Sequence, residues 1–306
     1  MIIYGAGMAG LVAAHMLRRF QPEVREAQDR LPENHAALLR FRTDACSVAT
    51  GIPFDRVRVS KAVAYNGRLH SVATLAMNNR YAAKVVGRVT NRSALNTVDS
   101  ERFIAPADFV AQLASSVRVQ FGSRLGAEVM ARDENSPPLI STIPMPAMAE
   151  LVGYKELPTL LRRPVWSVRA QLKDCDVYQT VYYPDETVPW YRASITGATL
   201  IVECLEEPDA FALPKQLASV LHDFGINQAV HSPVVKKQAY GKISTPDPEG
   251  CRRFVLWLTD RYRIYSLGRF ATWRQLLLDD VVSDVRVIER LADYRGGYKQ
   301  ELEKAR

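Results

Sequence analysis

Cysteine is scarce in the sequence, and its spacing excludes two classes of site. The four cysteines, Cys46, Cys175, Cys204 and Cys251, lie far apart and form no C-x-x-C pair. The five histidines form no H-x-x-H or H-E-x-x-H motif. Zinc sites and disulfide frameworks depend on such spacings. We therefore expect neither a metal site nor a disulfide framework.

Long apolar runs are also absent. A transmembrane helix needs about eighteen or more consecutive apolar residues, and the sequence contains no such run. The apolar opening spans only a few residues and has no basic residues before it, unlike a secretory signal peptide. Internal repeats and low-complexity tracts are missing too. We expect a cytoplasmic protein that does not contact a membrane.

The composition is that of a globular protein with an excess of positive charge. Hydrophobic residues make up 47% of the 306 residues, and the mean hydropathy is −0.13. Such values are ordinary for a folded chain with one large domain or two small ones. The formal net charge is +7, and a basic surface attracts nucleic acid, sugar nucleotides or a phosphate-bearing cofactor. A solvated basic surface without a partner explains the charge equally well.

A glycine motif near the start of the chain is the strongest functional signal. Residues 2–4 are typical of a short buried strand, residues 11–20 of a helix and residues 22–27 of a second strand. Together they predict a β-α-β unit with parallel strands. Between the first strand and the helix lies the sequence GAGMAG, residues 5–10. A G-x-G-x-x-G turn in this context is typical of a dinucleotide-binding domain.

Each glycine of this turn has its own physical reason. Gly5 permits the tight turn, Gly7 lets the backbone approach a pyrophosphate, and Gly10 lets the helix pack on the strand. The N-terminus of the helix then faces the phosphates. Glu26 ends the second strand sixteen residues after Gly10, where an acid binds the ribose. A turn without a ligand and a surface acid are the alternatives. The neighbouring residues expected to line the nucleotide are Met8, Ala9 and Ala27.

The middle of the chain predicts a second sheet. Asn66 and Gly67 favour the two-residue turn of a hairpin over residues 56–72. Apolar and polar residues alternate in segments between residues 166 and 205, which predicts antiparallel strands. The other expected elements are a helix at 105–116, a strand at 117–121, a strand, turn and helix over 137–153, a helix at 214–225, strands at 254–260 and 263–268, and a helix at 271–294.

Three segments resemble the flavin amine oxidase superfamily, which includes protoporphyrinogen oxidase and UDP-galactopyranose mutase. GAGMAGLVAAHML followed by VREAQDRL resembles the start of that family. LISTIPMPAMAELV resembles the strand and turn on which the family's chain returns to its nucleotide domain. IYSLGRFATWRQLLLDDVV resembles its C-terminal flavin segment, most of all that of the mutase. The resemblance covers the nucleotide domain and is much weaker over residues 155–245, where substrate would bind.

The resemblance implies an α/β fold with two parts. One is a Rossmann-like FAD-binding domain of the glutathione-reductase type, and the other is an inserted antiparallel β-sheet that binds substrate. We expect the FAD-binding domain to comprise residues 1–60, 105–154 and 246–306. The substrate-binding layer would then comprise residues 61–104 and 155–245.

The cofactor implied by the resemblance is non-covalent FAD, because no cysteine lies near Gly268 for covalent attachment. Arg269 would neutralise charge on the reduced flavin or hold a phosphate; a surface arginine is the alternative. Relatives carry a Gly-Gly-Arg loop soon after the ribose acid, and residues 29–43 have no Gly-Gly pair. Arg30, Arg40 or Arg42 would supply that phosphate contact instead. The further FAD-binding residues that the resemblance implies are Val119, Thr142, Ile143, Pro144, Gly268, Arg269, Ala271, Thr272 and Trp273.

The most aromatic stretch of the middle layer is VYYPDETVPWYRAS, residues 181–194. Its aromatic residues would line a substrate pocket, and Arg192 would pair with a carboxylate or phosphate of the substrate. Strand alternation puts about half of them in the core instead. Several flavin amine oxidases use a lysine that holds a water at flavin N5, so by resemblance Lys242 is a catalytic candidate, with Tyr240 and Arg192; a solvated lysine in a turn is the alternative. The substrate-binding candidates are Tyr182, Tyr183, Trp190, Tyr191 and Arg192.

Three functions remain open on the sequence. The first is an FAD-dependent oxidase of a C–N bond, acting on a small amine or on an amine carried by DNA. The chain resembles phage flavoproteins that hypermodify thymine, which would place it in the host cytoplasm. The second is a non-redox UDP-sugar mutase. The third is a nucleic-acid-binding protein on a flavoprotein fold, since the stretches ALLRFR, DRVRV and KVVGRVTNRS are basic; polar faces of half-buried strands explain these equally well.

Overall fold

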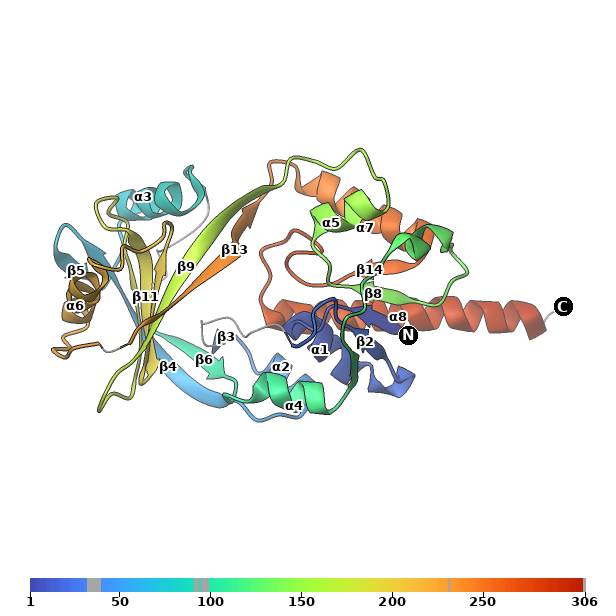
Figure 1. Cartoon of the computed structure of the whole chain (residues 1–306), viewed down its shortest axis with the longest axis horizontal. Helices are drawn as coiled ribbons and strands as arrows, with labels where there is room; N and C mark the ends of the chain where they lie inside the picture. Colours follow the sequence, from blue (N-terminus) through green and yellow to red (C-terminus); the bar gives the residue numbers. More distant parts are fainter. Residues whose placement is uncertain (32–39, 91–93, 95–98, 231, 305–306) are drawn as a thin grey trace.

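The computed structural model describes residues 1–31, 40–90, 94, 99–230 and 232–304. Its strands form two sheets at opposite ends of the molecule (Figure 1). The long strands β9 (Leu161–Gln171) and β13 (Val234–Ser244) pair with each other and run from one part toward the other. The chain therefore has the two-part α/β architecture predicted from the sequence.

The smaller sheet is parallel throughout. Its order is β14-β8-β1-β2-β7, and every neighbouring pair runs in the same direction. The β-α-β unit predicted from the glycine motif is thus confirmed. Parallel sheets have both faces covered, and the middle strands are accordingly apolar and buried. The strands are β1 (Ile2–Tyr4), β2 (Glu23–Arg25), β7 (Arg118–Gln120), β8 (Leu139–Ser141) and β14 (Ile264–Ser266).

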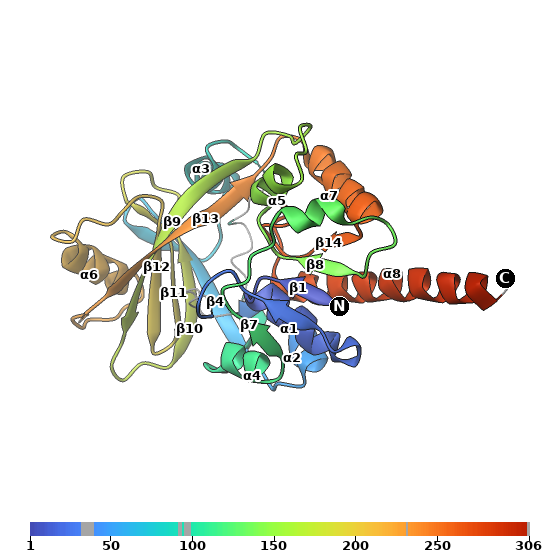
Figure 2. The same ribbon diagram turned by 45° about the vertical axis from the view of Figure 1, so that its right-hand side comes forward.

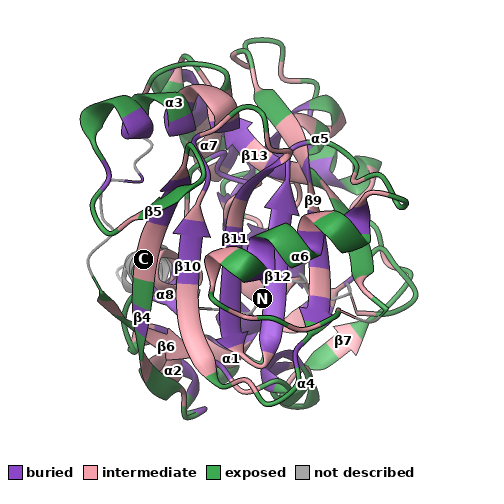
Figure 3. Ribbon diagram, turned by 90° about the vertical axis from the view of Figure 1, so that its left-hand side faces the viewer, coloured by how far each residue is buried: buried purple, intermediate pink, exposed green. Residues whose placement is uncertain are grey.

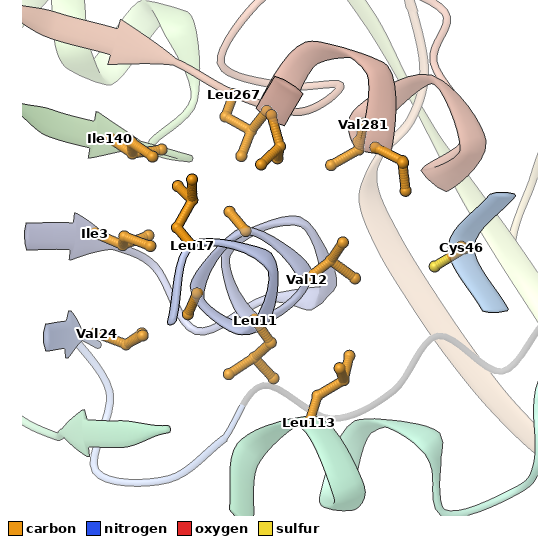
Figure 4. Close-up of a cluster of buried hydrophobic side chains, with 14 of the residues drawn as sticks. Ile3, Leu11, Val12, Leu17, Val24, Cys46, Leu113, Ile140, Leu267 and Val281 are labelled. Carbon is orange, nitrogen blue, oxygen red and sulfur yellow. The ribbon is translucent and has the colours of Figure 1, made fainter. Parts of the chain in front are cut away.

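Helix α1 lies at the centre of the core beside this sheet (Figure 4). Ile3, Val24 and Ile140 point toward it from three strands, while Leu113 and Val281 approach it from two other helices. A helix enclosed in this way must be apolar on every side, which explains the sequence GLVAA. The helices of this part are α1 (Met8–Met16), α2 (Ala45–Thr50), α4 (Phe109–Ser115), α5 (Met145–Leu151), α7 (Pro248–Tyr262) and α8 (Leu278–Lys304), with 3-10 turns at Arg18–Phe20 and Ala127–Ala131.

The larger sheet has nine strands in the order β13-β9-β12-β11-β10-β4-β6-β3, with β5 paired to β4. Its pairs are antiparallel, as predicted, except that β4 and β10 run parallel. A parallel pair needs a long crossover, and here the chain between the two strands passes through the nucleotide domain. The remaining strands are β3 (Arg40–Phe41), β4 (Asp55–Tyr65), β5 (Arg68–His70), β6 (Ser100–Ile104), β10 (Val177–Tyr182), β11 (Trp190–Gly197) and β12 (Thr199–Cys204).

Two helices cover opposite faces of this sheet. Helix α6 (Leu213–Asp223) lies across β11 and β12, whose apolar residues pack beneath it (Figure 3). Helix α3 (Leu75–Val86) packs on the other face, against Tyr191. Gly225 follows α6 with a φ of +69°, as expected for a helix that ends in a left-handed glycine. The Asn66–Gly67 turn between β4 and β5 is confirmed by its positive φ angles of 51° and 68°.

The predicted strand at residues 254–260 is wrong, because these residues belong to helix α7. The carboxylate of Asp247 caps this helix by accepting a hydrogen bond from the Gly250 N–H at 2.8 Å. The apolar run FVLWL is too short for periodicity to distinguish helix from strand. The buried residues nevertheless have helical spacing: Cys251, Phe254, Leu258 and Tyr262.

The last helix starts later than predicted. Instead of residues 271–294, helix α8 covers Leu278–Lys304, and its C-terminal part projects beyond the rest of the molecule (Figure 2). Thr272 makes one helical turn with Gly268, through a backbone hydrogen bond of 3.1 Å. Trp273 then adopts a φ of +50°, which ends that turn. No helix among the described residues is long and apolar enough to cross a membrane.

Candidate nucleotide and substrate site

The predicted nucleotide-binding residues come together at one edge of the parallel sheet. The glycine turn follows β1, Glu26 follows β2, Thr142 follows β8 and Gly268 lies just after β14. Because all these strands run in the same direction, their carboxyl ends share one edge. Ligands of open α/β sheets bind outside that edge. Four segments that are far apart in the sequence thus form one candidate site.

The structure explains two of the three glycines by protein contacts alone. Gly5 has a φ of +102°, and a Cβ there would lie 2.0 Å from Oγ1 of Thr142. A Cβ on Gly10 would lie 2.0 Å from the carbonyl oxygen of Gly5. Gly7 is different, because a Cβ on it would meet no atom of the described chain within 4 Å. The fold therefore requires Gly5 and Gly10, whereas Gly7 borders open space, as expected for a glycine that a ligand approaches.

Helix α1 begins at this open side. Gly7 is its N-cap residue, no side chain caps the helix, and its first turn contains no acid. Uncapped N–H groups and the positive end of the helix dipole form an anion-binding site. The carboxylate of Glu26 accepts the Ala6 N–H at 2.7 Å and the Gln28 N–H at 3.1 Å. Glu26 is thus buried against the glycine turn.

The other sequence-predicted contacts of the nucleotide lie around this edge with varied exposure. Thr142 donates its hydroxyl to the carbonyl oxygen of Tyr4 at 3.0 Å. Met8, Ala9, Val119, Ile143 and Pro144 are half-buried, and Ala27, Arg30 and Arg42 are exposed. Arg42 donates its backbone N–H to Asp279 at 2.9 Å. Arg40 pairs in β3 with Ile104 through its backbone, and its side chain lies outside the described set.

The turn that follows β14, residues 268–273 (the C-terminal turn), packs on the glycine turn. Gly268 has a φ of +89°, and a Cβ there would lie 3.0 Å from the Cβ of Ala9. Thr272 donates its hydroxyl to the Gly268 carbonyl at 2.8 Å, which holds the turn closed. Ala271, Thr272 and Trp273 are buried, so they shape the turn from within. The backbone near Gly268 thus lies beside the open N-terminus of α1.

The same turn contacts the larger sheet. Arg269 donates to the carbonyl oxygen of Gly241 in β13 at 3.0 Å. Tyr240 packs against Phe270 and Trp273, with ring centroids 5.5 Å and 6.0 Å away. These contacts place the Tyr240–Lys242 segment, predicted as catalytic, next to the turn that the resemblance assigns to the flavin.

A β-bulge in β11 gathers three functional groups. The pairing of β11 with β12 shifts between Trp190 and Arg192, so that Tyr191 and Arg192 both project beside Glu203. The Tyr191 hydroxyl donates to one oxygen of Glu203 at 2.7 Å. Nε of Arg192 donates to the other oxygen. Both carboxylate oxygens of Glu203 are therefore occupied by this pair.

A second bulge brings Lys242 to the same place. The pairing of β13 with β9 shifts between Gln238 and Lys242. Gly241 is required there, because a Cβ on it would lie 2.4 Å from the Cβ of Val165. Nζ of Lys242 lies 4.3 Å from the centroid of the Tyr191 ring, a cation–π distance. Lys242 thus forms one cluster with Tyr191, Arg192 and Glu203.

Glu203 is the member of this cluster that we did not predict from the sequence. Burial raises the pKa of its carboxyl, but Arg192, Lys242 and the two hydrogen bonds outweigh that effect and hold the pKa at about 2. Burial and the Glu203 charge raise the pKa of Tyr191 well above its usual range. The cluster at neutral pH therefore contains a carboxylate, two cations and a neutral tyrosine. The sequence does contain a signal for Glu203: it is the one charged residue in the otherwise apolar stretch TLIVECL. A buried acid needs partners that donate hydrogen bonds or neutralise its charge.

The aromatic candidates divide between the two faces of the sheet. Tyr183 and Trp190 pack in the cluster under α6, with their ring centroids 5.9 Å apart. Tyr191 and Tyr182 lie on the opposite face, around Tyr81 of α3. The structure therefore brings Tyr182 and Tyr191 near Arg192 and Lys242, whereas Tyr183 and Trp190 have the core position that alternation predicts for half of the set.

A cavity of about 390 Å³ lies elsewhere, at the opposite edge of the parallel sheet. Its lining residues come from segments that precede β8 and β14, so it opens where those strands begin. It is separate from the candidate site. The lining residues are Met130, Arg132, Asp133, Glu134, Asn135, Asp260, Arg261 and Tyr262.

Comparisons with solved structures show the fold. Reduced UDP-galactopyranose mutase matches with a TM-score of 0.66 and 15% identity, covering 96% of this chain and 93% of the mutase. A protein assigned as a protoporphyrinogen oxidase from Exiguobacterium sp. 255-15 matches with a TM-score of 0.61 and 11% identity, covering 95% and 98%. A flavoprotein/dehydrogenase from Cytophaga hutchinsonii matches with a TM-score of 0.51 and 13% identity, covering 95% and 78%.

These similarities confirm the predicted fold class and the resemblance from which it came. Both enzymes named for the resemblance, the mutase and the oxidase, occur among the matching structures. No protein-family model matches the chain, and no curated protein matches it in sequence. The solved structures thus show the fold of the chain.

Proposed function

We propose that the chain is an FAD-dependent oxidoreductase that binds FAD non-covalently at the carboxyl edge of the parallel sheet. The observation that carries this proposal is the open space at Gly7 beside the uncapped N-terminus of α1. Such a site fits a pyrophosphate. Glu26 beside it fits a ribose, and the Gly268 turn fits the flavin end. The similarity in fold to several flavoenzymes supports the same cofactor.

The reaction that we propose is the oxidation of a C–N bond. The bound FAD would accept a hydride from the carbon next to nitrogen, and water would hydrolyse the resulting imine to a carbonyl compound and a free amine. Lys242 is the residue that would hold the attacking water, because its ammonium group is fixed over Tyr191 close to the C-terminal turn. Tyr240 packs on Phe270 and Trp273 and would fix the distance between that segment and the C-terminal turn.

The test is anaerobic reduction of the bound flavin. The purified protein is mixed with a panel of primary and secondary amines, free and attached to DNA, without oxygen. Loss of the flavin's visible absorbance, together with one carbonyl product for each flavin reduced, is the expected result. A yellow protein that no amine of the panel bleaches, but that dithionite reduces, would argue against amine oxidation while leaving the cofactor in place.

A UDP-sugar mutase is the second candidate, favoured by the TM-score of 0.66 to the reduced mutase. A mutase needs reduced flavin and consumes no electrons over a turnover. The discriminating measurement is therefore incubation of dithionite-reduced protein with UDP-galactopyranose, followed by analysis of the sugar ring form. Conversion without net flavin oxidation would favour the mutase; no conversion, combined with bleaching by an amine, favours the oxidase.

Nucleic acid is a partner that the charge distribution favours. Residues 56–98 contain eight of the forty lysines and arginines and none of the thirty-three acids, so the rest of the chain has a net charge of about −1. Within this segment Arg56 and Arg58 pair with Glu101 and Asp99. The exposed arginines without an ion pair among the described residues are Arg68, Arg80 and Arg88, around β5 and α3. This surface fits a phosphate backbone.

Salt-dependent binding tests this partner. Fluorescence anisotropy with a duplex DNA probe is measured at several salt concentrations for the wild type and for a triple Arg68, Arg80 and Arg88 to Ser variant. We expect the variant to bind at least tenfold more weakly and with a smaller salt slope. A matched triple Ser variant of the exposed Arg252, Arg286 and Arg290 should bind like the wild type. Equal losses in both variants would mean that only net charge matters.

A further inference from the structure

The cluster around Glu203 has one positive charge more than its acids can neutralise. Two cations, Arg192 and Lys242, lie beside this carboxylate, and both of its oxygens already accept hydrogen bonds. Arg192 and Lys242 are half-buried, and partly desolvated positive charge of this kind attracts an anion. The surplus therefore indicates an anionic ligand.

Arg192 has the donors that such a ligand needs. Its guanidinium has five N–H groups in a planar fork, and only the Nε–H is used, by Glu203. Its two terminal nitrogens have no acceptor among the described residues. About a third of the side chain, 35%, is exposed. The free end of the fork matches the two oxygens of a carboxylate or phosphate.

Glu203 determines where that fork points. An arginine side chain has many rotamers that must be fixed when it binds a ligand, and one charge-assisted hydrogen bond at Nε removes much of that freedom before any ligand binds. The β11 bulge requires this arrangement, because it places Tyr191 and Arg192 side by side against a single residue of β12. Each oxygen of Glu203 already accepts one hydrogen bond, one from Tyr191 and one from Arg192.

The cluster is linked to the nucleotide edge by a continuous path of contacts. Gly268 packs on Ala9 of the glycine turn. Arg269, which follows Gly268, donates to the carbonyl oxygen of Gly241. Lys242, which follows Gly241, lies over the Tyr191 ring. An anion on Arg192 would therefore be held on the side of the sheet that the C-terminal turn meets.

We propose that the amine oxidised at this site carries an anionic group, a carboxylate or a phosphate, which the free end of Arg192 binds, and that Glu203 is the positioning residue that aims Arg192. This inference rests on the proposed oxidation of an amine and names its substrate class. Neither residue takes part in the bond changes, so the reaction balances as it does for an uncharged amine.

The test compares matched probes on the flavin-loaded protein. One pair is N-benzylglycine and N-benzylmethylamine, which differ by a carboxylate; the other is phosphoethanolamine and ethanolamine, which differ by a phosphate. Dissociation constants come from the flavin spectrum without oxygen and, independently, from tryptophan fluorescence. We expect at least one anionic member to bind the wild type tenfold or more tightly than its partner, and the pair that shows this identifies the anion.

Three variants separate positioning from folding. Arg192→Met should remove the preference for the anionic member. Glu203→Gln should reduce it severalfold while the uncharged member binds as before, and Glu203→Asp should restore part of it. Lys237→Met is the matched control, because Lys237 lies in the same strand as Lys242 but over Trp166, in the cluster under α6. Its preference should equal that of the wild type.

Two results would overturn the inference: equal affinity of the wild type for both members of each pair, including no binding of either, or an undiminished preference in Arg192→Met. Failure of the cofactor proposal looks different. A colourless protein whose tryptophan fluorescence still shows the preference would remove FAD and leave the anion receptor standing. A yellow protein without the preference would leave FAD standing and remove the anion receptor.

Discussion

Gly268 and Ala9 lie in direct contact, with only 3.0 Å between the Ala9 Cβ and the position of a Cβ on Gly268. The turn after the last strand of the parallel sheet thus closes on the turn after its first strand. Two segments more than 250 residues apart in the sequence form the two sides of one edge.

Gly7→Val should abolish FAD retention without unfolding the protein. The new side chain would enter the open space where the structure has no protein atom, and the pyrophosphate would lose its approach to the backbone. The melting temperature of the flavin-free variant should match that of the flavin-free wild type. The measurement is the ratio of visible to ultraviolet absorbance after purification, and a yellow variant would contradict the assignment of the turn.

Gly5→Ala should instead damage the fold. Its Cβ would lie 2.0 Å from Thr142 Oγ1, at a φ of +102° that side chains rarely adopt. Strain of this kind costs on the order of 1–3 kcal/mol, in addition to the clash. Urea unfolding of the flavin-free protein should show the loss in Gly5→Ala and not in Gly7→Val. Equal stability of the two variants would mean that the turn relaxes more easily than its contacts suggest.

Lys242→Met should slow reduction of the flavin and leave the flavin bound. The lysine lies in the larger sheet, away from the glycine turn, so FAD content should be unchanged. Loss of a group that positions a reacting water or proton typically costs about 100-fold or more in rate. Stopped-flow reduction by an amine that bleaches the wild type measures the effect. A Lys242→Met variant that reduces as fast as Lys237→Met would remove Lys242 from the chemistry.

Glu203→Gln should flatten the acid limb of the stability profile. The folded-state pKa of about 2 lies below the usual 4.5, so the unfolded chain binds more protons between these values. The stabilisation is therefore complete above about pH 4.5 and is lost as pH falls toward 2. Between pH 6 and pH 3 the wild type should lose about 2 kcal/mol that the variant does not lose. Urea unfolding at each pH measures the difference, and parallel profiles would contradict the charge network.

Lys84→Met should loosen the connection between β10 and β11. Nζ of Lys84 lies 2.5 to 3.1 Å from four backbone carbonyl oxygens of that connection and its ends, which share its three N–H donors and hold the connection against α3. Removing one donor from several buried acceptors should cost about 2–4 kcal/mol. The exposed Lys215→Met is the control, expected to change the free energy of unfolding by less than about 0.5 kcal/mol. If Lys84→Met changed the free energy of unfolding no more than Lys215→Met does, this would show that water replaces the ammonium group.

The nucleotide edge was predictable from the sequence because its signals are local. The turn GAGMAG, the acid at position 26 and the segment LISTIP each adjoin a short strand, and parallel pairing then brings them to one edge. The failed strand at residues 254–260 was local too, but a short apolar run does not distinguish helix from strand. Only the cap at Asp247 and the spacing of Phe254 and Leu258 indicate the helix.

The charged cluster was predictable only in part. The sequence identified Arg192 and Lys242 as separate candidates. Nothing in it indicated that their side chains lie close together. Their meeting depends on two bulges, and a bulge is a property of the register between strands that are distant in the sequence. The strand β13 was missed for the same reason, because its bulge interrupts the alternation from which strands are recognised. Glu203 belongs to this register-dependent part of the site.

FAD binding is tested most directly by one measurement: the absorbance spectrum of the purified protein, followed by heat release and identification of the chromophore. We predict the two visible bands of oxidised flavin, and FAD in the supernatant after heating because its attachment is non-covalent. A colourless protein that does not take up added FAD would contradict the account, because Gly7 and the N-terminus of α1 would then border open space for some other ligand.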